Sequence, residues 1–158
     1  MKGGIVVFYQ KLIDLNISVE TEEQLFDLVG SRAIKLDFAR IGYISNLEKR
    51  ELSYPTGLKF PQVSLALPHV DPQYVENPFI YIGRTTKPLK LKQMGDNADM
   101  EAKNFLFLGL KNGSKQPELL AQIISAFQDK DFVKHYMETE NTIDMLQIVK
   151  NKFKEVIK

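Results

Sequence analysis

Apolar positions recur at helical spacing in the first third of the chain and predict two helices. Thr21-Glu22-Glu23-Gln24 is a capping-box pattern, so a helix is expected to begin near Thr21. The apolar residues that continue it at the spacing of one helix face are Leu25, Leu28 and Val29. A second amphipathic helix is expected from about Gly42 to Ser53, ending before Pro55, because the residue before a proline avoids the helical conformation.

Short apolar runs predict strands further along. The stretch Val63 to Leu67 follows a turn at Pro55-Thr56-Gly57 and is expected to end at Pro68, which has no backbone N–H for a sheet ladder. Two more strands are expected at Phe79 to Ile82 and at Asn104 to Leu110. Both runs are rich in aromatic or β-branched residues and are bounded by Gly or Pro.

The last third of the chain reads as helical. Pro117 suits the first turn of a helix, and a buried stripe follows it, formed by Leu119, Leu120, Ile123, Ile124 and Phe127. A short helix is expected from about Asp131 to Met137 and a last one from about Thr142 to Ile157. Strands interspersed with helices predict an α/β fold, a mixed β-sheet flanked by helices on both faces.

Size and composition limit the possible functions. With 158 residues and 44% hydrophobic content, we expect a single domain spanning residues 1–158. A net charge of +1 does not provide the basic field that nucleic-acid binding requires. The chain has no cysteine and only two histidines, far apart in the sequence, so no metal site is expected. The apolar patch from Ile5 to Tyr9 is far too short to span a membrane, and we expect a cytoplasmic protein without membrane insertion.

His69 stands directly behind Pro68, where the first predicted strand ends. Open α/β sheets carry their ligands at the carboxyl ends of their strands. With a reference pKa of about 6.5, much of the histidine is unprotonated at neutral pH. His69 is therefore a candidate nucleophile or general base. The other histidine, His135, lies on a short amphipathic helix and is expected to face solvent or pack at an edge.

Neighbouring residues favour phosphoryl transfer at His69. Arg50 is the leading candidate to stabilise phosphoryl oxygens, because a guanidinium presents a planar fork of donors. Thr56 offers a hydroxyl donor, Gly57 would let the backbone approach the histidine, and Glu51 is expected to orient Arg50 or cap a helix. Phosphate-binding P-loops, dinucleotide fingerprints and Gly-x-Ser-x-Gly elbows do not occur. Which imidazole nitrogen attacks is left open.

The run Arg50 to Gly57, Arg-Glu-Leu-Ser-Tyr-Pro-Thr-Gly, is followed by Leu65-Ala66-Leu67-Pro68-His69. This pair of motifs resembles the R-E-x-x-x-P/S-T-G … A-I-P-H signature of enzyme IIA domains of the mannitol/fructose class (type 2) of the bacterial phosphoenolpyruvate-dependent sugar phosphotransferase system. The resemblance extends over nearly the whole chain, including the strand from Phe105 to Leu110 and the helix after it. It implies a three-layer fold, in which helices sandwich a mixed sheet, and an activity that needs neither nucleotide nor metal.

The resemblance also implies roles for particular residues and partners. His69 would accept a phosphoryl group from the phosphohistidine carrier protein and pass it to a cysteine of a sugar-specific IIB component, which works with the membrane component IIC. Arg50 would stabilise the phosphoryl group. Because the membrane component binds the sugar in such systems, the sequence of this chain does not identify the sugar.

Gln116 is a departure from the usual family pattern. Mannitol and fructose members usually carry a second histidine where Gln116 stands, at the start of the helix after the last predicted strand. A glutamine there, together with Pro55-Thr56-Gly57, resembles the galactitol subgroup. Glutamine can donate a neutral hydrogen bond to His69 or its phosphoryl group but cannot carry a charge.

Two other functions and a docking surface follow from the same residues. A regulatory domain would use phosphorylation of His69 to control a protein partner instead of feeding sugar uptake, and transfer to a IIB component distinguishes the two. A hydrolase with His69 as its base is disfavoured, because no nucleophile or metal accompanies it. A small apolar rim for transient partners is expected around His69, with Leu58, Phe60 and Val70 as its candidates. Two lysines flank the same edge and would steer a phosphorylated partner, Lys111 and Lys115.

Overall fold

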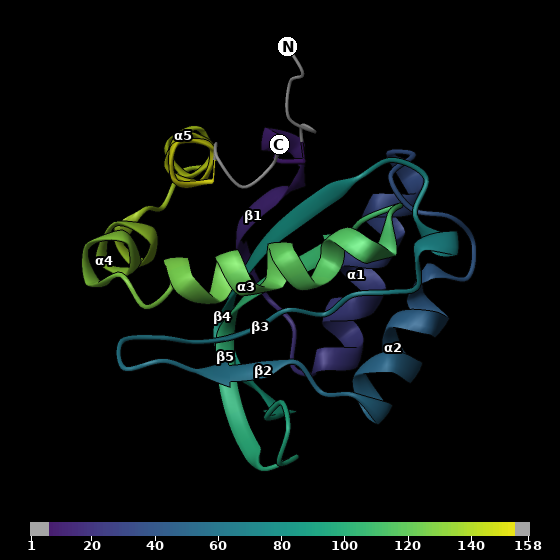
Figure 1. The fold of residues 1–158 in the computed structure, drawn as a ribbon, viewed down its shortest axis with the longest axis horizontal. Helices are drawn as coiled ribbons and strands as arrows, with labels where there is room; N and C mark the ends of the chain where they lie inside the picture. The colour runs from purple at the N-terminus through teal and green to yellow at the C-terminus, as the bar shows by residue number, and fades with distance from the viewer. Residues whose placement is uncertain (1–6, 154–158) are drawn as a thin grey trace.

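A mixed β-sheet forms the centre of the fold in the computed structural model, which describes residues 7–153 (Figure 1). Within these residues its strand order is β1-β4-β5-β3-β2. The strands are β1 (Ile13–Ile17), β2 (Gly57–Lys59), β3 (Ser64–Ala66), β4 (Phe79–Lys92) and β5 (Asp99–Gly109). The long strands β4 and β5 pair antiparallel, whereas β1 runs parallel to β4 and β3 runs parallel to β5. The sheet is therefore mixed, as the sequence predicts.

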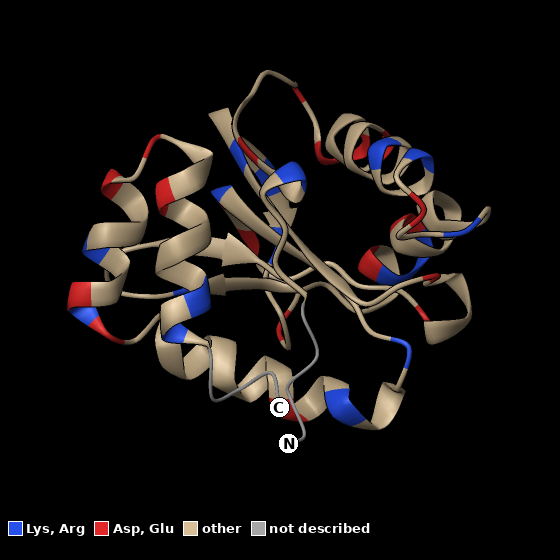
Figure 2. Ribbon diagram, turned by 90° about the horizontal axis from the view of Figure 1, so that it is seen from above, with Lys and Arg blue, Asp and Glu red and all other residues tan. Residues whose placement is uncertain are grey.

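Helices cover both faces of this sheet (Figure 2). Helices α1 (Glu22–Lys35) and α2 (Tyr43–Ser53) lie on one face. The opposite face is covered by α3 (Gln116–Ala126), α4 (Lys130–Glu138) and α5 (Thr142–Lys152). Short 3-10 turns connect some of these elements: η1 (Gln10–Leu12), η2 (Pro72–Tyr74) and η3 (Gly113–Lys115). The three layers confirm the predicted architecture.

The alternation of side chains along the two central strands produces two separate cores. Phe79 and Tyr81 of β4 pack toward α1 and α2, together with Phe105 and Phe107 of β5. The intervening residues pack toward the C-terminal helices: Ile80, Ile82, Leu106 and Leu108. Because successive side chains of a strand point to opposite faces, a continuous apolar run is needed to bury both sides of one sheet. The sequence predicts both runs as strands from their aromatic and β-branched content, and the structure adds that each run is buried on both of its faces.

Most of the predicted helix ends lie within one or two residues of the ends in the structure. Thr21 caps α1 by accepting a hydrogen bond from the backbone N–H of Gln24 at 3.1 Å, while the Gln24 side chain accepts from the backbone N–H of Glu20 at 2.7 Å. Helix α2 ends at Ser53, before Pro55, and α3 begins at Gln116. The predicted last helix runs to Ile157, whereas α5 ends at Lys152, and residues 154–157 of the prediction lie outside the described residues.

The strands differ more from the prediction. Strand β1 was not expected, although the alternation Ile13-Asp14-Leu15-Asn16-Ile17 is a strand signal. Strand β4 runs ten residues beyond Ile82, across a register shift between Arg84 and Leu89 that accommodates Pro88. A proline inside a polar segment predicts the end of a strand, but irregular pairing lets this one continue.

None of the helices within residues 7–153 is long and apolar enough to cross a membrane.

Candidate functional site

His69 lies just past the end of β3, at the edge of the sheet. The chain continues beside β5 after Pro68, because the backbone N–H of Leu108 donates to the Pro68 carbonyl at 2.9 Å. His69 and Leu108 also form an isolated parallel bridge. Pro68 thus ends the regular ladder without turning the chain away from the sheet, and the imidazole of His69 is half-buried at its rim.

The His69 side chain is held by the backbone next to it. Its Nδ1 lies 2.9 Å from the carbonyl oxygen of Leu67. A carbonyl only accepts, so Nδ1 carries the proton and Nε2 keeps a free lone pair. Burial lowers the pKa of His69, the Leu67 hydrogen bond opposes this, and the charge of Arg50 lowers the pKa further while that of Asp71 raises it. These interactions favour a neutral imidazole at pH 7, with its free lone pair on Nε2.

A pocket of about 230 Å³ adjoins the imidazole. Its lining combines His69 and Gln116 with an apolar wall formed by Leu108, Gly113, Pro117 and Leu120. The Gln116 amide donates to the Val70 carbonyl at 3.4 Å, which is long for a hydrogen bond. The structure therefore brings Gln116 and His69 to one pocket and leaves the amide only weakly held.

Arg50 extends from α2 toward the segment that follows His69. Its Nη1 donates to Asp71 Oδ1 at 3.0 Å, and its guanidinium carbon lies 5.7 Å from the centre of the Tyr54 ring. The Nε of Arg50 is buried and has no hydrogen-bond partner. An unsatisfied buried donor costs about 1–3 kcal/mol, and such groups occur at functional sites that await an acceptor. A phosphoryl oxygen is an acceptor of the required kind.

Thr56 and Glu51 form a buried polar connection instead of facing the imidazole. The Glu51 carboxylate accepts from the backbone N–H and from the hydroxyl of Thr56, both at 2.8 Å. The Thr56 hydroxyl oxygen accepts in turn from the backbone N–H of Leu67 at 3.1 Å. Because the one hydroxyl proton goes to Glu51, this geometry makes Thr56 a support for Leu67, and so for His69, and not a donor to the phosphoryl group.

Gly57 also has a different role from the one expected. A Cβ on this residue would lie 2.5 Å from the Lys92 carbonyl oxygen and 2.5 Å from Met100 Sδ. The close approach that requires glycine is thus to the β4–β5 hairpin and not to the histidine. Likewise Glu51 anchors Thr56, whereas the contacts that orient Arg50 come from Asp71 and Tyr54.

The sequence pattern did not single out two residues of this site, Asn46 and Asp71. The Asn46 amide donates to Asp71 Oδ2 at 3.2 Å, and its carbonyl oxygen accepts from the Asp71 backbone N–H at 2.9 Å. The signals for them are the i, i+4 spacing of Asn46 and Arg50 on one helix and the i, i+2 spacing of His69 and Asp71 in an extended segment.

The expected docking rim is only partly present. Val70 is buried, so its predicted place on an exposed rim is wrong, and Leu58 and Phe60 are half-buried against the core. The exposed large apolar side chains around α2 are Ile41, Leu52 and Tyr54.

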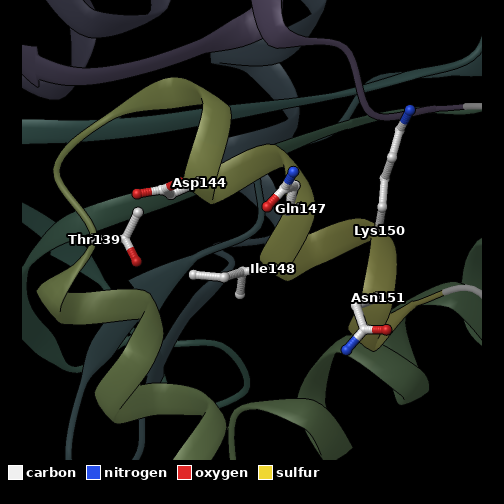
Figure 3. Close-up of a pocket in the computed structure, with 6 residues that line it drawn as sticks. All are labelled: Thr139, Asp144, Gln147, Ile148, Lys150 and Asn151. Atoms are coloured by element: carbon white, nitrogen blue, oxygen red, sulfur yellow. The ribbon is translucent and has the colours of Figure 1, made fainter.

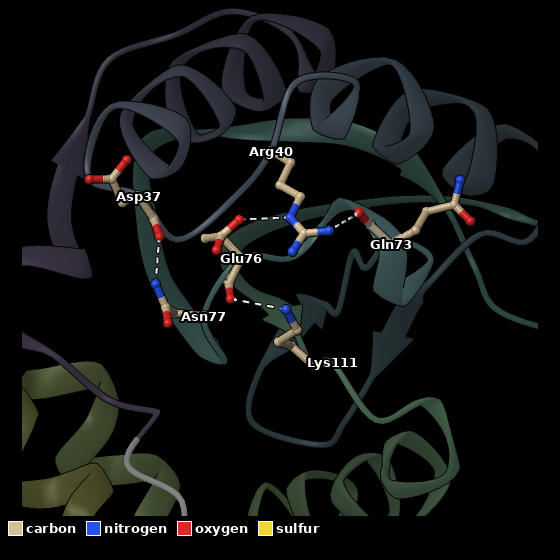
Figure 4. Close-up of polar contacts among 6 residues, drawn as sticks. All are labelled: Asp37, Arg40, Gln73, Glu76, Asn77 and Lys111. Atoms are coloured by element: carbon tan, nitrogen blue, oxygen red, sulfur yellow. Dashed lines mark hydrogen bonds and ion pairs between the residues drawn. The ribbon is translucent and has the colours of Figure 1, made fainter.

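Of the two lysines, Lys111 donates to the Glu76 backbone carbonyl at 3.3 Å (Figure 4), and Lys115 is exposed at the start of α3. His135 is exposed on α4, as expected, and its Nδ1 lies 2.9 Å from the Asp131 carbonyl oxygen. It takes no part in the site around His69.

A second concave region lies on α5 and the end of α4 (Figure 3). Its lining residues are Thr139, Asp144, Gln147, Ile148, Lys150 and Asn151. Asp144 is engaged in the cap of α5, where its Oδ2 accepts from the Asn141 amide at 2.7 Å. The region therefore lacks the reactive groups found around His69. Within residues 7–153 no cluster of three or more carboxylates or histidines is arranged to hold a metal ion.

Known proteins share this fold and this sequence pattern. Residues 7–152 match the family described as phosphoenolpyruvate-dependent sugar phosphotransferase system, EIIA 2. The galactitol-specific EIIA component of Escherichia coli strain K12 is 24% identical over 117 residues, which cover 74% of this chain and 78% of that protein.

Two solved structures illustrate the similarity of the fold. The mannitol IIA of Escherichia coli superposes with a TM-score of 0.72 at 16% identity, covering 89% of this chain and 97% of that one. The nitrogen regulatory protein IIA-Ntr of Neisseria meningitidis gives a TM-score of 0.72 at 18% identity, covering 90% and 96%.

A neutral imidazole at a sheet edge, with a guanidinium beside it, is the arrangement of a phosphoryl carrier. The chain belongs to the type 2 EIIA family of the phosphoenolpyruvate-dependent sugar phosphotransferase system. It is a phosphotransfer component that works through a phosphohistidine.

Proposed function

We propose that His69 carries the phosphoryl group, receiving it on Nε2 from the phosphohistidine carrier protein and passing it to a cysteine of a sugar-specific IIB component. The observation that carries this proposal is the hydrogen bond from His69 Nδ1 to the Leu67 carbonyl, which leaves Nε2 as the nitrogen with a free lone pair. The lowered pKa of His69, caused first by burial, supports it by keeping the ring neutral.

Each transfer conserves the phosphoryl group. As the Nε2–P bond forms, the P–N bond of the donor's phosphohistidine breaks and the donor imidazole keeps the electron pair. In the second transfer the Nε2–P bond breaks as a cysteine thiolate forms a P–S bond, and the lone pair returns to Nε2. Arg50 offsets the charge on the phosphoryl oxygens through its unpartnered Nε, and the weakly held Gln116 amide is a second donor.

The test is phosphorylation of the full chain by the general phosphotransferase proteins with labelled phosphoenolpyruvate. We expect a phosphoryl adduct that is labile in acid and stable in base. His69→Ala should abolish it, and the matched variant His135→Ala should retain it, since His135 is exposed on α4. Label that persists in His69→Ala would overturn the assignment.

The partner we propose is a galactitol-type IIB component that works with a membrane IIC component in the cytoplasm-facing transport complex. Two observations support this choice: the 24% identity to galactitol-specific EIIA components and the glutamine at position 116. A solved complex of mannitol enzyme IIA with phosphorylated enzyme IIB from Escherichia coli contains a domain with this fold, at a TM-score of 0.71 and 15% identity. Faster transfer of label to a galactitol IIB than to a mannitol IIB is expected, and the reverse order would exclude the galactitol assignment.

A regulatory role is the second candidate. The observation that favours it is the similarity in fold to the nitrogen regulatory protein IIA-Ntr, which equals the similarity to mannitol IIA. A purely regulatory domain would accept label on His69 but fail to pass it to any IIB component. Transfer to the proposed IIB therefore distinguishes the two roles.

A further inference from the structure

Asp71 lies two residues after His69 and touches Arg50, yet no function is assigned to it. Its Oδ1 accepts from Arg50 Nη1 at 3.0 Å, and its Oδ2 accepts from the Asn46 amide at 3.2 Å. Its backbone N–H donates to the Asn46 carbonyl oxygen at 2.9 Å. Asn46 and Arg50 lie on the same face of α2, four residues apart, so one helix holds both the arginine and the group that positions its partner.

We propose that Asp71, held by Asn46, is a positioning residue that fixes the Arg50 guanidinium by its Nη1 and presents the opposite donor edge to the phosphoryl group on His69. This inference rests on the proposed role of His69 as the phosphoryl carrier. It assigns Asp71 no contact with the reacting atoms, because the carboxylate acts through Arg50.

The pairing of the guanidinium supports this assignment. Arginine has five N–H donors in a rigid fork, with Nε and one Nη forming an edge that can bind two oxygens at once. Asp71 takes one donor of Nη1, while the buried Nε has no partner. A carboxylate bound to the Nε edge would occupy it, whereas the observed contact is made at Nη1 and leaves Nε without a hydrogen-bond partner. The Tyr54 ring, 5.7 Å from the guanidinium carbon, further limits rotation of the group.

The segment that carries Asp71 is fastened at its other end as well (Figure 4). Arg40 Nε donates to Glu76 Oε1 at 2.7 Å, and Arg40 Nη1 donates to the Gln73 carbonyl at 3.4 Å. Lys111, two residues after the end of β5, donates to the Glu76 carbonyl, so the chain that follows β5 also holds this segment. Asp71 is therefore fixed both by Asn46 and by its own loop, and it holds Arg50 in one position. A mobile carboxylate would instead compete with the phosphoryl group for Arg50.

The positioning role of Asp71 is tested by a double-mutant cycle between Asp71→Asn and Arg50→Gln in the full chain. The rate of phosphoryl acceptance is measured with the phosphorylated carrier protein and with phosphoramidate, a small donor that needs no docking surface. We expect Asp71→Asn to slow acceptance from both donors by about tenfold in the native chain and by less than about twofold in Arg50→Gln. Asn46→Ala, which frees Asp71, should slow acceptance in the same way.

The matched control is Asp27→Asn, which removes the same charge from an exposed position on α1 and should leave the rate unchanged. An Asp71→Asn rate within twofold of the native rate would overturn the proposal. So would a full tenfold loss in the Arg50→Gln background, because Asp71 would then act independently of Arg50. Absence of label on His69 in the native chain would instead refute the proposed function, and the two failures are thus distinguishable.

Discussion

The carbonyl oxygen of Leu67 accepts the Nδ1 hydrogen bond of His69 at 2.9 Å, while the backbone N–H of the same Leu67 donates to the Thr56 hydroxyl at 3.1 Å. Leu67 thus connects the buried pair Thr56 and Glu51 to the imidazole of His69. Backbone atoms set the orientation and the tautomer of the imidazole, so the ring is ordered before a phosphoryl donor arrives.

The direction of the His69 pKa predicts the pH dependence of phosphoryl acceptance. Burial lowers this pKa below 6.5, so the ring is neutral above that pH and gains a proton only under more acidic conditions. The rate should be constant from pH 7 upward and fall as the pH drops through a midpoint below 6.5. Rates measured with phosphoramidate between pH 4.5 and pH 8 would check this, and a midpoint above 6.5 would contradict it.

Thr56 should matter for stability as well as for the site. Thr56→Val keeps the shape of the side chain but leaves a Glu51 oxygen without its Thr56 partner in a buried region, and leaves the Leu67 N–H only its 3.4 Å contact with the Thr56 backbone carbonyl. We expect a loss of about 3 kcal/mol in the free energy of unfolding and slower phosphoryl acceptance. Thr56→Ser keeps the hydroxyl and should lose only about 1 kcal/mol. Urea unfolding of both variants is the measurement, and equal losses would argue against the hydrogen-bonded connection.

Gln116 should affect the transfer rate and not the stability. Its amide shares the pocket of His69 and is held only by a 3.4 Å contact with the Val70 carbonyl. Gln116→Leu removes the amide, so we expect phosphoryl acceptance to slow by about threefold to tenfold, with the free energy of unfolding within about 0.5 kcal/mol of the native value. Glu118→Ala, an exposed change in the same helical turn, is the control. A native rate in Gln116→Leu would show that the Gln116 amide does not contribute to phosphoryl transfer.

The half-buried carboxyl of Glu22 should make the stability of the fold depend on pH. Burial, followed by the nearby charge of Glu51, raises its pKa to about 8. Because the unfolded chain loses this proton near pH 4.5, native stability declines as the pH rises from about 4.5 toward 8. Glu22→Gln removes this penalty and should raise the free energy of unfolding at pH 8 by about 1–3 kcal/mol, with little difference at pH 4.

The neighbouring change Glu23→Gln, at an exposed position, is the control for loss of one charge at the start of α1. Thermal or urea unfolding of both variants at pH 4 and pH 8 gives the comparison. If Glu22→Gln raised the free energy of unfolding equally at pH 4 and pH 8, the pKa of Glu22 would not be raised as its burial requires.

Local signals are sufficient for most of the helices. The cap at Thr21 and the break at Pro55 depend on residues within one turn, and both lie where the sequence places them. Strand ends were harder to predict, since β4 passes Pro88 by a register shift that depends on β5. Partner strands supply the hydrogen bonds that let an irregular segment continue, and a single segment does not reveal its partner.

The single domain over residues 1–158 remains a prediction.

By itself, the sequence determined the central parts of the core strands, the helices, the cap at Thr21, and the motif that places His69 after Pro68 and Arg50 before Thr56. These properties follow from spacing along one segment. The tertiary structure alone decided which nitrogen of His69 is free, that the Thr56 hydroxyl serves Glu51, and that Asn46 and Asp71 hold Arg50. The Thr56–Glu51 contact depends on how the chain turns after α2, and the contacts of Asp71 with Asn46 and Arg50 join α2 to a segment more distant in sequence. Such hydrogen bonds depend on distances that only folding sets.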